Sequence, residues 1–125
     1  MMQVTPLFDR KLRSSCTWIG SSRSSGMDCM YPLIESIIED LAAKKHLFNE
    51  LDRICGDHTI LATNTSTLPV VELAMATERP AQVVGVHFFN PAPMMSLVEV
   101  IAPLTASADT VEAAKAFATA CGKDV

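Results

Sequence analysis

Short apolar runs alternate with longer amphipathic segments from residue 31 onward. The runs are rich in β-branched residues, which favours buried strands over short helices. They predict strands at residues 33–38, 59–63, 82–89 and 96–101. Strands that alternate with helices indicate an α/β fold with a mainly parallel sheet and flanking helices. Only residues 91–95 separate the last two strands, too few for a crossover helix, so we expect that pair to be antiparallel.

The amphipathic segments predict three helices with recognisable ends. Asp40 can cap the first, and Gly56 can end it. Pro69 opens a second, with Glu72 in its first turn, and Ser107 caps a third. The apolar positions of the first helix are Leu41, Leu47, Phe48, Leu51, Ile54 and Cys55. Those of the third are Val111, Ala114, Phe117, Ala118 and Cys121, with Gly122 at its end and residues 123–125 able to begin another strand.

Residues 1–30 differ from the rest of the chain. They are basic, acid-poor and rich in serine, with no helical or alternating periodicity. We interpret them as an unassigned leader. The alternative, an organelle transit peptide, would imply the mitochondrial matrix, but the amphipathic helix typical of such peptides is not evident. Residues 31–125 are then a single domain, in keeping with a chain of 125 residues.

Composition narrows the class of protein. Hydrophobic residues make up 49% of the chain and the formal net charge is −4, which argues against a nucleic-acid partner. The apolar runs are too short to cross a bilayer. The four cysteines show no C-x-x-C spacing, so we expect reduced thiols in a cytoplasmic protein and no metal site.

Polar residues follow three of the predicted strands. They are Glu39-Asp40, residues 64–67 and residues 87–90. Ligands of open parallel sheets gather beyond the carboxyl ends of the strands, so we expect these groups to converge on a site.

His87 and Glu99 occupy unusual places for polar residues. His87 lies at the end of an apolar strand, where a histidine is more often a satisfied core residue. Glu99 lies on the Leu97/Ile101 side of another apolar strand, and a buried carboxylate requires a partner. If the two strands pair, Glu99 reaches the imidazole, fixes its tautomer and leaves the other nitrogen as a general base. Spacing alone leaves the core and catalytic interpretations open.

Ser66 also has two interpretations. Its hydroxyl could satisfy backbone amides at the start of the next helix. Alternatively, it could be presented to a substrate at the mouth of the sheet.

Three ordered motifs resemble the 3-hydroxyacyl-CoA dehydrogenases, including 3-hydroxybutyryl-CoA dehydrogenases. They are Ile-Leu-Ala-Thr-Asn-Thr-Ser at 60–66, Val-His-Phe-Phe-Asn-Pro-Ala-Pro at 86–93 and Leu-Val-Glu-Val-Ile at 97–101. Leu-Ile-Glu-Ser-Ile-Ile-Glu-Asp at 33–40 is similar as well. The resemblance implies a Rossmann-like fold and oxidation of an (S)-3-hydroxyacyl-CoA thioester to the 3-oxoacyl-CoA with NAD, or the reverse reaction.

The resemblance also implies roles for individual residues. His87 matches the catalytic base, Glu99 the carboxylate that pairs with it, and Ser66 the serine that hydrogen-bonds the reacting oxygen near the nicotinamide. Asn90 matches an asparagine of the same pocket. Glu39 and Lys44 match residues that contact the nicotinamide-side ribose, although Lys44 could also be a solvated helix lysine. Histidine suits the proton transfer because it titrates near neutral pH.

Departures from the family pattern favour a partial domain. Residues 1–30 hold no G-x-G-x-x-G turn, so the first βαβ unit that receives the pyrophosphate is missing or replaced. The resemblance also implies a helical domain that completes the acyl-CoA site, and we expect that domain to lie outside these residues. The uncovered sheet edge predicts self-association as a homo-oligomer.

A non-catalytic fragment is the alternative to an enzyme. A 3-hydroxyisobutyrate-type dehydrogenase is disfavoured because such enzymes typically use lysine for proton transfer.

Overall fold

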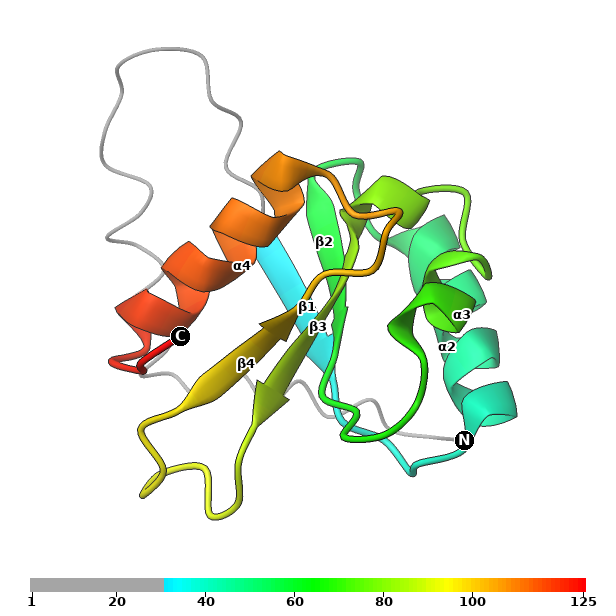
Figure 1. Cartoon of the computed structure of the whole chain (residues 1–125). Helices are drawn as coiled ribbons and strands as arrows, with labels where there is room; N and C mark the ends of the chain where they lie inside the picture. Colours follow the sequence, from blue (N-terminus) through cyan, green and yellow to red (C-terminus); the bar gives the residue numbers. More distant parts are fainter. Residues whose placement is uncertain (1–30) are drawn as a thin grey trace, which may run out of the picture.

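The computed structural model describes residues 31–125, and the expectations for residues 1–30 lie outside that range. The described chain forms a four-stranded sheet in the order β1-β2-β3-β4, with helices on both faces (Figure 1). The strands are β1 (Tyr31–Glu35), β2 (Thr59–Thr63), β3 (Val83–Phe88) and β4 (Val98–Ile101). The helices are α2 (Leu41–Ile54), α3 (Val70–Ala74), η1 (Pro80–Gln82) and α4 (Ala108–Ala120). This confirms the predicted α/β fold.

The sheet has the predicted mixture of directions. β1 pairs with β2 and β2 with β3 in parallel, while β3 and β4 are antiparallel. Because parallel neighbours end at the same edge of the sheet, residues that follow β1, β2 and β3 are brought together there. Of residues 123–125, which were expected to begin another strand, only Asp124 pairs, in an isolated parallel bridge with Leu97.

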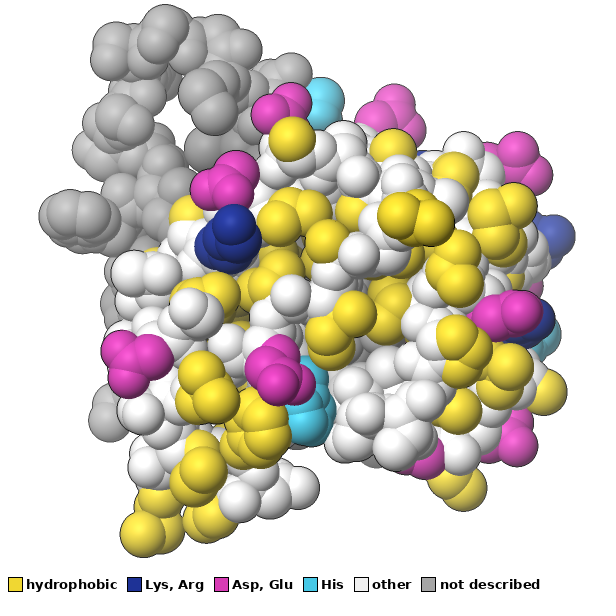
Figure 2. All heavy atoms as spheres, in the orientation of Figure 1, with side chains coloured by type: hydrophobic (Ala, Val, Ile, Leu, Met, Phe, Trp, Pro, Cys, Tyr) yellow, Lys and Arg dark blue, Asp and Glu magenta, His cyan; other side chains and the backbone are white. Residues whose placement is uncertain are grey.

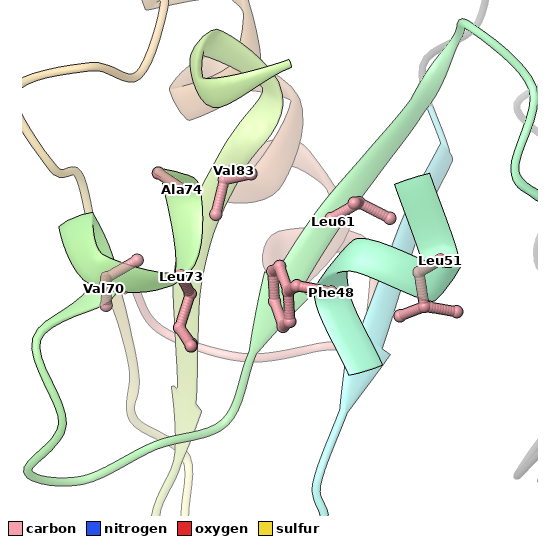
Figure 3. Packing of buried hydrophobic residues seen from close by; sticks show 7 residues of the cluster. All are labelled: Phe48, Leu51, Leu61, Val70, Leu73, Ala74 and Val83. Atoms are coloured by element: carbon pink, nitrogen blue, oxygen red, sulfur yellow. The ribbon is translucent and has the colours of Figure 1, made fainter. Parts of the chain in front are cut away.

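The two faces of the sheet carry separate hydrophobic clusters. On one face α2 and α3 pack against β2 and β3 (Figure 3). That cluster consists of Phe48, Leu51, Leu61, Val70, Leu73, Ala74 and Val83. On the other face α4 presents Thr110, Ala114 and Ala118, spaced four residues apart and fully buried. Small side chains at this spacing let the helix lie close to the sheet.

Helix ends follow the predicted capping. The Asp40 side chain accepts the Ala43 N–H at 2.7 Å, and the Ser107 side chain accepts the Thr110 N–H at 3.2 Å. Gly122 follows α4 with φ 75°, a left-handed conformation that suits glycine.

Two expectations were wrong in detail. The first strand occupies Tyr31–Glu35, not residues 33–38, because the Glu35 side chain turns back to accept the Ile37 N–H at 3.0 Å. Ile37 and Ile38 are therefore exposed. Ile54 is 76% exposed, since it lies about 80° around the helix from Lys44, the centre of the buried stripe.

Candidate active site

Three predicted site residues meet at the carboxyl edge of the sheet. Ser66 Oγ lies 3.0 Å from His87 Nε2, and His87 Nδ1 lies 3.3 Å from a carboxylate oxygen of Glu99. Ser66 follows β2, His87 lies in β3 and Glu99 lies in β4. The three side chains therefore form one line of polar contacts, although they are up to 33 positions apart in the sequence.

Strand pairing explains the contact between His87 and Glu99. The two residues are direct partners in the antiparallel ladder, so their side chains leave the same face of the sheet. The His87 side chain is 14% exposed and the Glu99 side chain 54% exposed. The imidazole is thus enclosed, in part by the Phe89 ring at a centroid distance of 4.6 Å. The expected burial of Glu99 was wrong, because its carboxylate reaches solvent.

The two neighbours of the imidazole favour one tautomer. An ionised carboxylate only accepts hydrogen bonds, so Nδ1 facing Glu99 carries the proton. Nε2 is then an acceptor, and the Ser66 hydroxyl donates to it. This arrangement leaves a basic nitrogen beside an exposed hydroxyl, which is what proton removal from an alcohol requires.

Asn64 ties the ends of three strands together, a role that the sequence interpretation missed. Its Oδ1 accepts the Phe88 N–H at 2.8 Å, its Nδ2 donates to Ser36 Oγ at 3.0 Å, and its own N–H donates to the Glu35 carbonyl at 3.0 Å. Asn64 thereby fixes the spacing between the Ser66 turn and the strand that carries His87. The motif Asn-Thr-Ser was visible in the sequence, but the partners of the asparagine are 24, 28 and 29 positions away.

Thr65, not Ser66, satisfies the backbone at the turn into α3. The Thr65 hydroxyl accepts the Leu68 N–H at 3.0 Å and the Thr67 N–H at 3.4 Å. The helix-start interpretation of the Ser66 hydroxyl was therefore wrong, because its neighbour takes that place. Thr65 is 1% exposed, whereas Ser66 is exposed.

Glu39 and Lys44 lie beside this turn in different surroundings. The Glu39 side chain is 44% exposed and accepts the Thr65 hydroxyl at 2.8 Å. Burial alone would raise the pKa of Glu39. The hydrogen bond from Thr65, the charge of Lys44 and a hydrogen bond from the Ser66 backbone outweigh burial and hold the pKa of Glu39 below its usual value.

Lys44 is buried, not solvated. Its side chain is 1% exposed, and its ammonium donates to both Glu35 carboxylate oxygens at 2.9 Å. A further contact reaches Glu39 at 3.5 Å. The alternative of a solvated lysine is wrong, because Glu35 supplies a buried counter-charge that the helical pattern does not reveal.

Asn90 lies outside this cluster of contacts. It is exposed in the loop after β3 and is followed by a cis peptide bond to Pro91. Among residues 31–125 no group of three or more His, Cys, Asp or Glu side chains is arranged to hold a metal ion. The helices of the same range are all too short or too polar to cross a membrane.

Comparisons with known proteins find similar sequences of one family. The family model for the NAD binding domain of 3-hydroxyacyl-CoA dehydrogenase matches residues 20–125. A probable 3-hydroxybutyryl-CoA dehydrogenase of Bacillus subtilis is 53% identical over 91 residues, covering 73% of this chain and 32% of the relative. The fatty acid oxidation complex subunit alpha of Shewanella oneidensis is 45% identical over 91 residues, 13% of its own length.

Solved structures of 3-hydroxybutyryl-CoA dehydrogenases are also similar to this chain. The 3-hydroxybutyryl-CoA dehydrogenase of Escherichia coli K12 matches with a TM-score of 0.72 and 41% identity, covering 74% of this chain and 20% of that one. The (S)-3-hydroxybutyryl-CoA dehydrogenase of Ralstonia eutropha matches with a TM-score of 0.71 and 38% identity. This chain spans a third or less of the length of these relatives.

Proposed function

Because the chain belongs to the 3-hydroxyacyl-CoA dehydrogenase family, we propose that it carries the catalytic part of an NAD-dependent oxidation of (S)-3-hydroxyacyl-CoA to 3-oxoacyl-CoA. The observation that carries this proposal is the line of contacts from Ser66 through His87 to Glu99. A base, a carboxylate that orients it and a hydroxyl beside it are the groups that reversible oxidation of an alcohol needs.

His87 is the base in this reaction. Ser66 Oγ and His87 Nε2 are 3.0 Å apart, so an oxygen placed about 3 Å from both would contact each within hydrogen-bond reach. His87 Nε2 takes the proton of the 3-hydroxyl as the C–H bond breaks and the C=O bond forms. Ser66 donates to the same oxygen and orients it, and Glu99 stabilises the imidazolium through Nδ1.

The residues present suit the nicotinamide end of the cofactor. NAD, when bound, accepts the hydride that leaves the alcohol carbon. Glu39 presents a half-exposed carboxylate that can accept a ribose hydroxyl, close to the Ser66 turn. Asn90 is exposed in the loop after β3, and we infer from the family resemblance that it lines the same pocket. Lys44 is buried and lies 3.5 Å from Glu39, so it affects the ribose contact by positioning the Glu39 carboxylate.

The described residues do not offer a matching site for the pyrophosphate of the cofactor. The glycines there are Gly56, Gly85 and Gly122, and none lies in a turn from the carboxyl end of a strand into a helix. Residues 31–125 thus offer no glycine-rich cradle for phosphates. This observation favours the second candidate, a folded piece of the enzyme that does not turn over by itself.

A spectrophotometric assay separates the two candidates. Purified protein is mixed with NADH and acetoacetyl-CoA, and the absorbance of NADH is followed. We expect a rate that His87→Ala lowers by about 10²- to 10⁴-fold, the usual contribution of a general base. His46→Ala, which changes an exposed histidine of α2, is the matched control and should leave the rate unchanged. A flat trace at high concentrations of the wild-type protein would leave only the non-catalytic candidate.

We also propose that the protein is a cytoplasmic homo-oligomer with no nucleic-acid or membrane partner. Apolar side chains are exposed around β4, including Leu97 at 44% and Ile101 at 37%, and they line a shallow groove with Val125. Figure 2 shows hydrophobic side chains gathered over β4 and the β3–β4 loop. Such patches favour association. Light scattering that gives a strict monomer at all concentrations would contradict the oligomer.

A further inference from the structure

We propose that Thr65 is a positioning residue that holds the Ser66 hydroxyl against His87, and that the buried Glu35–Lys44 pair anchors it through Glu39. The effect on turnover rests on the proposed function, whereas the effect on the geometry of Ser66 does not.

The Thr65 hydroxyl holds both sides of the turn that presents Ser66. It donates to Glu39 Oε2 at 2.8 Å, which ties the turn to the segment between β1 and α2. It also accepts the Leu68 N–H at 3.0 Å, which closes the turn into α3. Ser66 lies between these two attachments. Its hydroxyl is exposed, so packing around the side chain does little to fix its direction.

Glu39, to which Thr65 is bound, is itself held by the buried ion pair of Glu35 and Lys44. Lys44 donates to both oxygens of Glu35 at 2.9 Å and to the Ile37 carbonyl at 3.3 Å. Glu35 also accepts the hydroxyl of Thr63, the last residue of β2. The ammonium is therefore held directly by groups of β1 and of the turn after it, and Thr63 of β2 in turn holds the Glu35 carboxylate. From that fixed position it lies 3.5 Å from Glu39 Oε1.

Charges and distances make Glu39 the link between the two ends. One of its oxygens faces the fixed ammonium and the other accepts the Thr65 hydroxyl, with Thr67 Oγ1 at 3.4 Å from that same oxygen. A carboxylate held by two fixed partners is itself fixed, although its side chain is half exposed. The chain of contacts then runs from Glu35 to Glu99 without a gap, through Lys44, Glu39, Thr65, Ser66 and His87.

Small displacements of Ser66 should lower the reaction rate, because catalysis depends steeply on the distances between the reacting groups. A catalytic contact that moves by about 1 Å can lose about 10²-fold in rate. Without its hydroxyl, Thr65 would no longer tie the turn to Glu39, and two backbone N–H groups of the turn would lose their acceptor. Ser66 could then leave His87 Nε2, to which it is bound at 3.0 Å.

The test compares two substitutions at one position. Thr65→Val keeps the shape of the side chain and removes the hydroxyl, whereas Thr65→Ser keeps the hydroxyl. Thr77→Val is the matched control, because the Thr77 hydroxyl also binds backbone groups of a turn, the Ala74 carbonyl and the Arg79 N–H, away from Ser66. The first readout is the ¹⁵N NMR signal of His87 Nε2 in the protein without cofactor, with Ser66→Ala as the reference for a lost contact.

We expect the Nε2 signal of Thr65→Val to move toward that of Ser66→Ala, and those of Thr65→Ser and Thr77→Val to stay with the wild type. A folded Thr65→Val protein whose Nε2 signal does not move would overturn the proposal. If Thr65→Val does not fold, Glu39→Ala is measured in its place. The Glu39 side chain is half exposed, so its removal should leave the fold intact. An unchanged Nε2 signal in Glu39→Ala would then overturn the proposal.

Turnover is the second readout where the protein is active. Thr65→Val should lower kcat by about 10- to 100-fold with little change in the KM for acetoacetyl-CoA, and Thr65→Ser should restore kcat. A merely structural role would lower the amount of folded protein and leave kcat per folded molecule unchanged, which would contradict the proposal. Absence of turnover in every variant, together with the expected NMR shifts, would reject the proposed function and leave this inference standing.

Discussion

His87 and Glu99 are direct partners in the antiparallel β3–β4 ladder, with Nδ1 of one 3.3 Å from Oε2 of the other. The predicted antiparallel pairing of these strands is thereby confirmed, and with it the contact that such pairing makes possible. The same ladder brings the imidazole and the carboxylate to one face, so the tautomer of His87 is set by strand register and not by a mobile loop.

Removal of the Glu99 charge should weaken catalysis and leave the fold intact. Glu99→Gln keeps the shape and one acceptor oxygen but no longer stabilises an imidazolium. Because the side chain is 54% exposed, we expect a fall in kcat of roughly 10- to 100-fold, smaller than for a buried partner. Steady-state kinetics measure it. Glu112→Gln, on the exposed face of α4, is the control, and equal rates for both variants would count against the role of Glu99.

Gly85 determines how closely β3 and β4 approach beside the site. A Cβ at this position would lie 2.9 Å from Ile101 Cβ and 3.2 Å from Val70 Cγ2. Gly85→Ala should therefore cost about 1–3 kcal/mol of unfolding free energy, the usual range for overpacking. Denaturant titration measures this cost. Gly56→Ala meets nothing within 4 Å and should stay within about 0.5 kcal/mol of the wild type. Equal stabilities of the two variants would show that the strands can move apart.

The buried pair of Glu35 and Lys44 should show strong coupling. Removal of one partner leaves an unpaired buried charge, so Glu35→Gln and Lys44→Met should each cost about 3–5 kcal/mol. The double variant should cost less than the sum, with a coupling energy of at least about 2 kcal/mol in a thermodynamic cycle. The exposed pair of Glu112 and Lys115 supplies the comparison, with an expected coupling of about 0.3–0.5 kcal/mol. Similar coupling in both cycles would contradict the burial of Lys44.

Asp52 should make stability depend on pH in the acid range. Burial raises the pKa of Asp52, but the Glu78 N–H at 2.7 Å and the Arg79 guanidinium at 2.6 Å outweigh it and hold the pKa below its usual value. A lowered pKa stabilises the folded state above the unfolded pKa of about 3.9, and this contribution is lost as the pH falls through the folded pKa.

Asp52→Asn should consequently be less stable than the wild type at pH 7, by about 2 kcal/mol, and the difference should shrink below about pH 4. Thermal or denaturant unfolding at several pH values measures it. Asp57→Asn is the control, because Asp57 is an exposed residue of the turn before β2. A difference between Asp52→Asn and the wild type that stays the same from pH 7 to pH 2 would refute the assignment.

Local sequence patterns were sufficient to predict the elements and the edge of the sheet at which polar groups collect. β2 occupies Thr59–Thr63 as expected, and Asp40 and Ser107 cap their helices as expected. These features depend on neighbours within a few positions, through apolar periodicity and capping side chains, so a local pattern is enough to reveal them.

The role of each polar side chain could be assigned only from the folded structure. Ser66 and Thr65 are adjacent hydroxyl residues, and the sequence does not say which one caps the turn and which one faces His87. Lys44 is an ordinary helix lysine in the sequence and a buried cation in the fold, because Glu35 enters the same space from β1. Lys44 and Glu35 are 9 positions apart and Ser66 and His87 are 21 apart, so these partners meet only in the folded domain. A buried charge or hydroxyl is stabilised only by such partners, so its role is fixed by the fold and not by the local sequence.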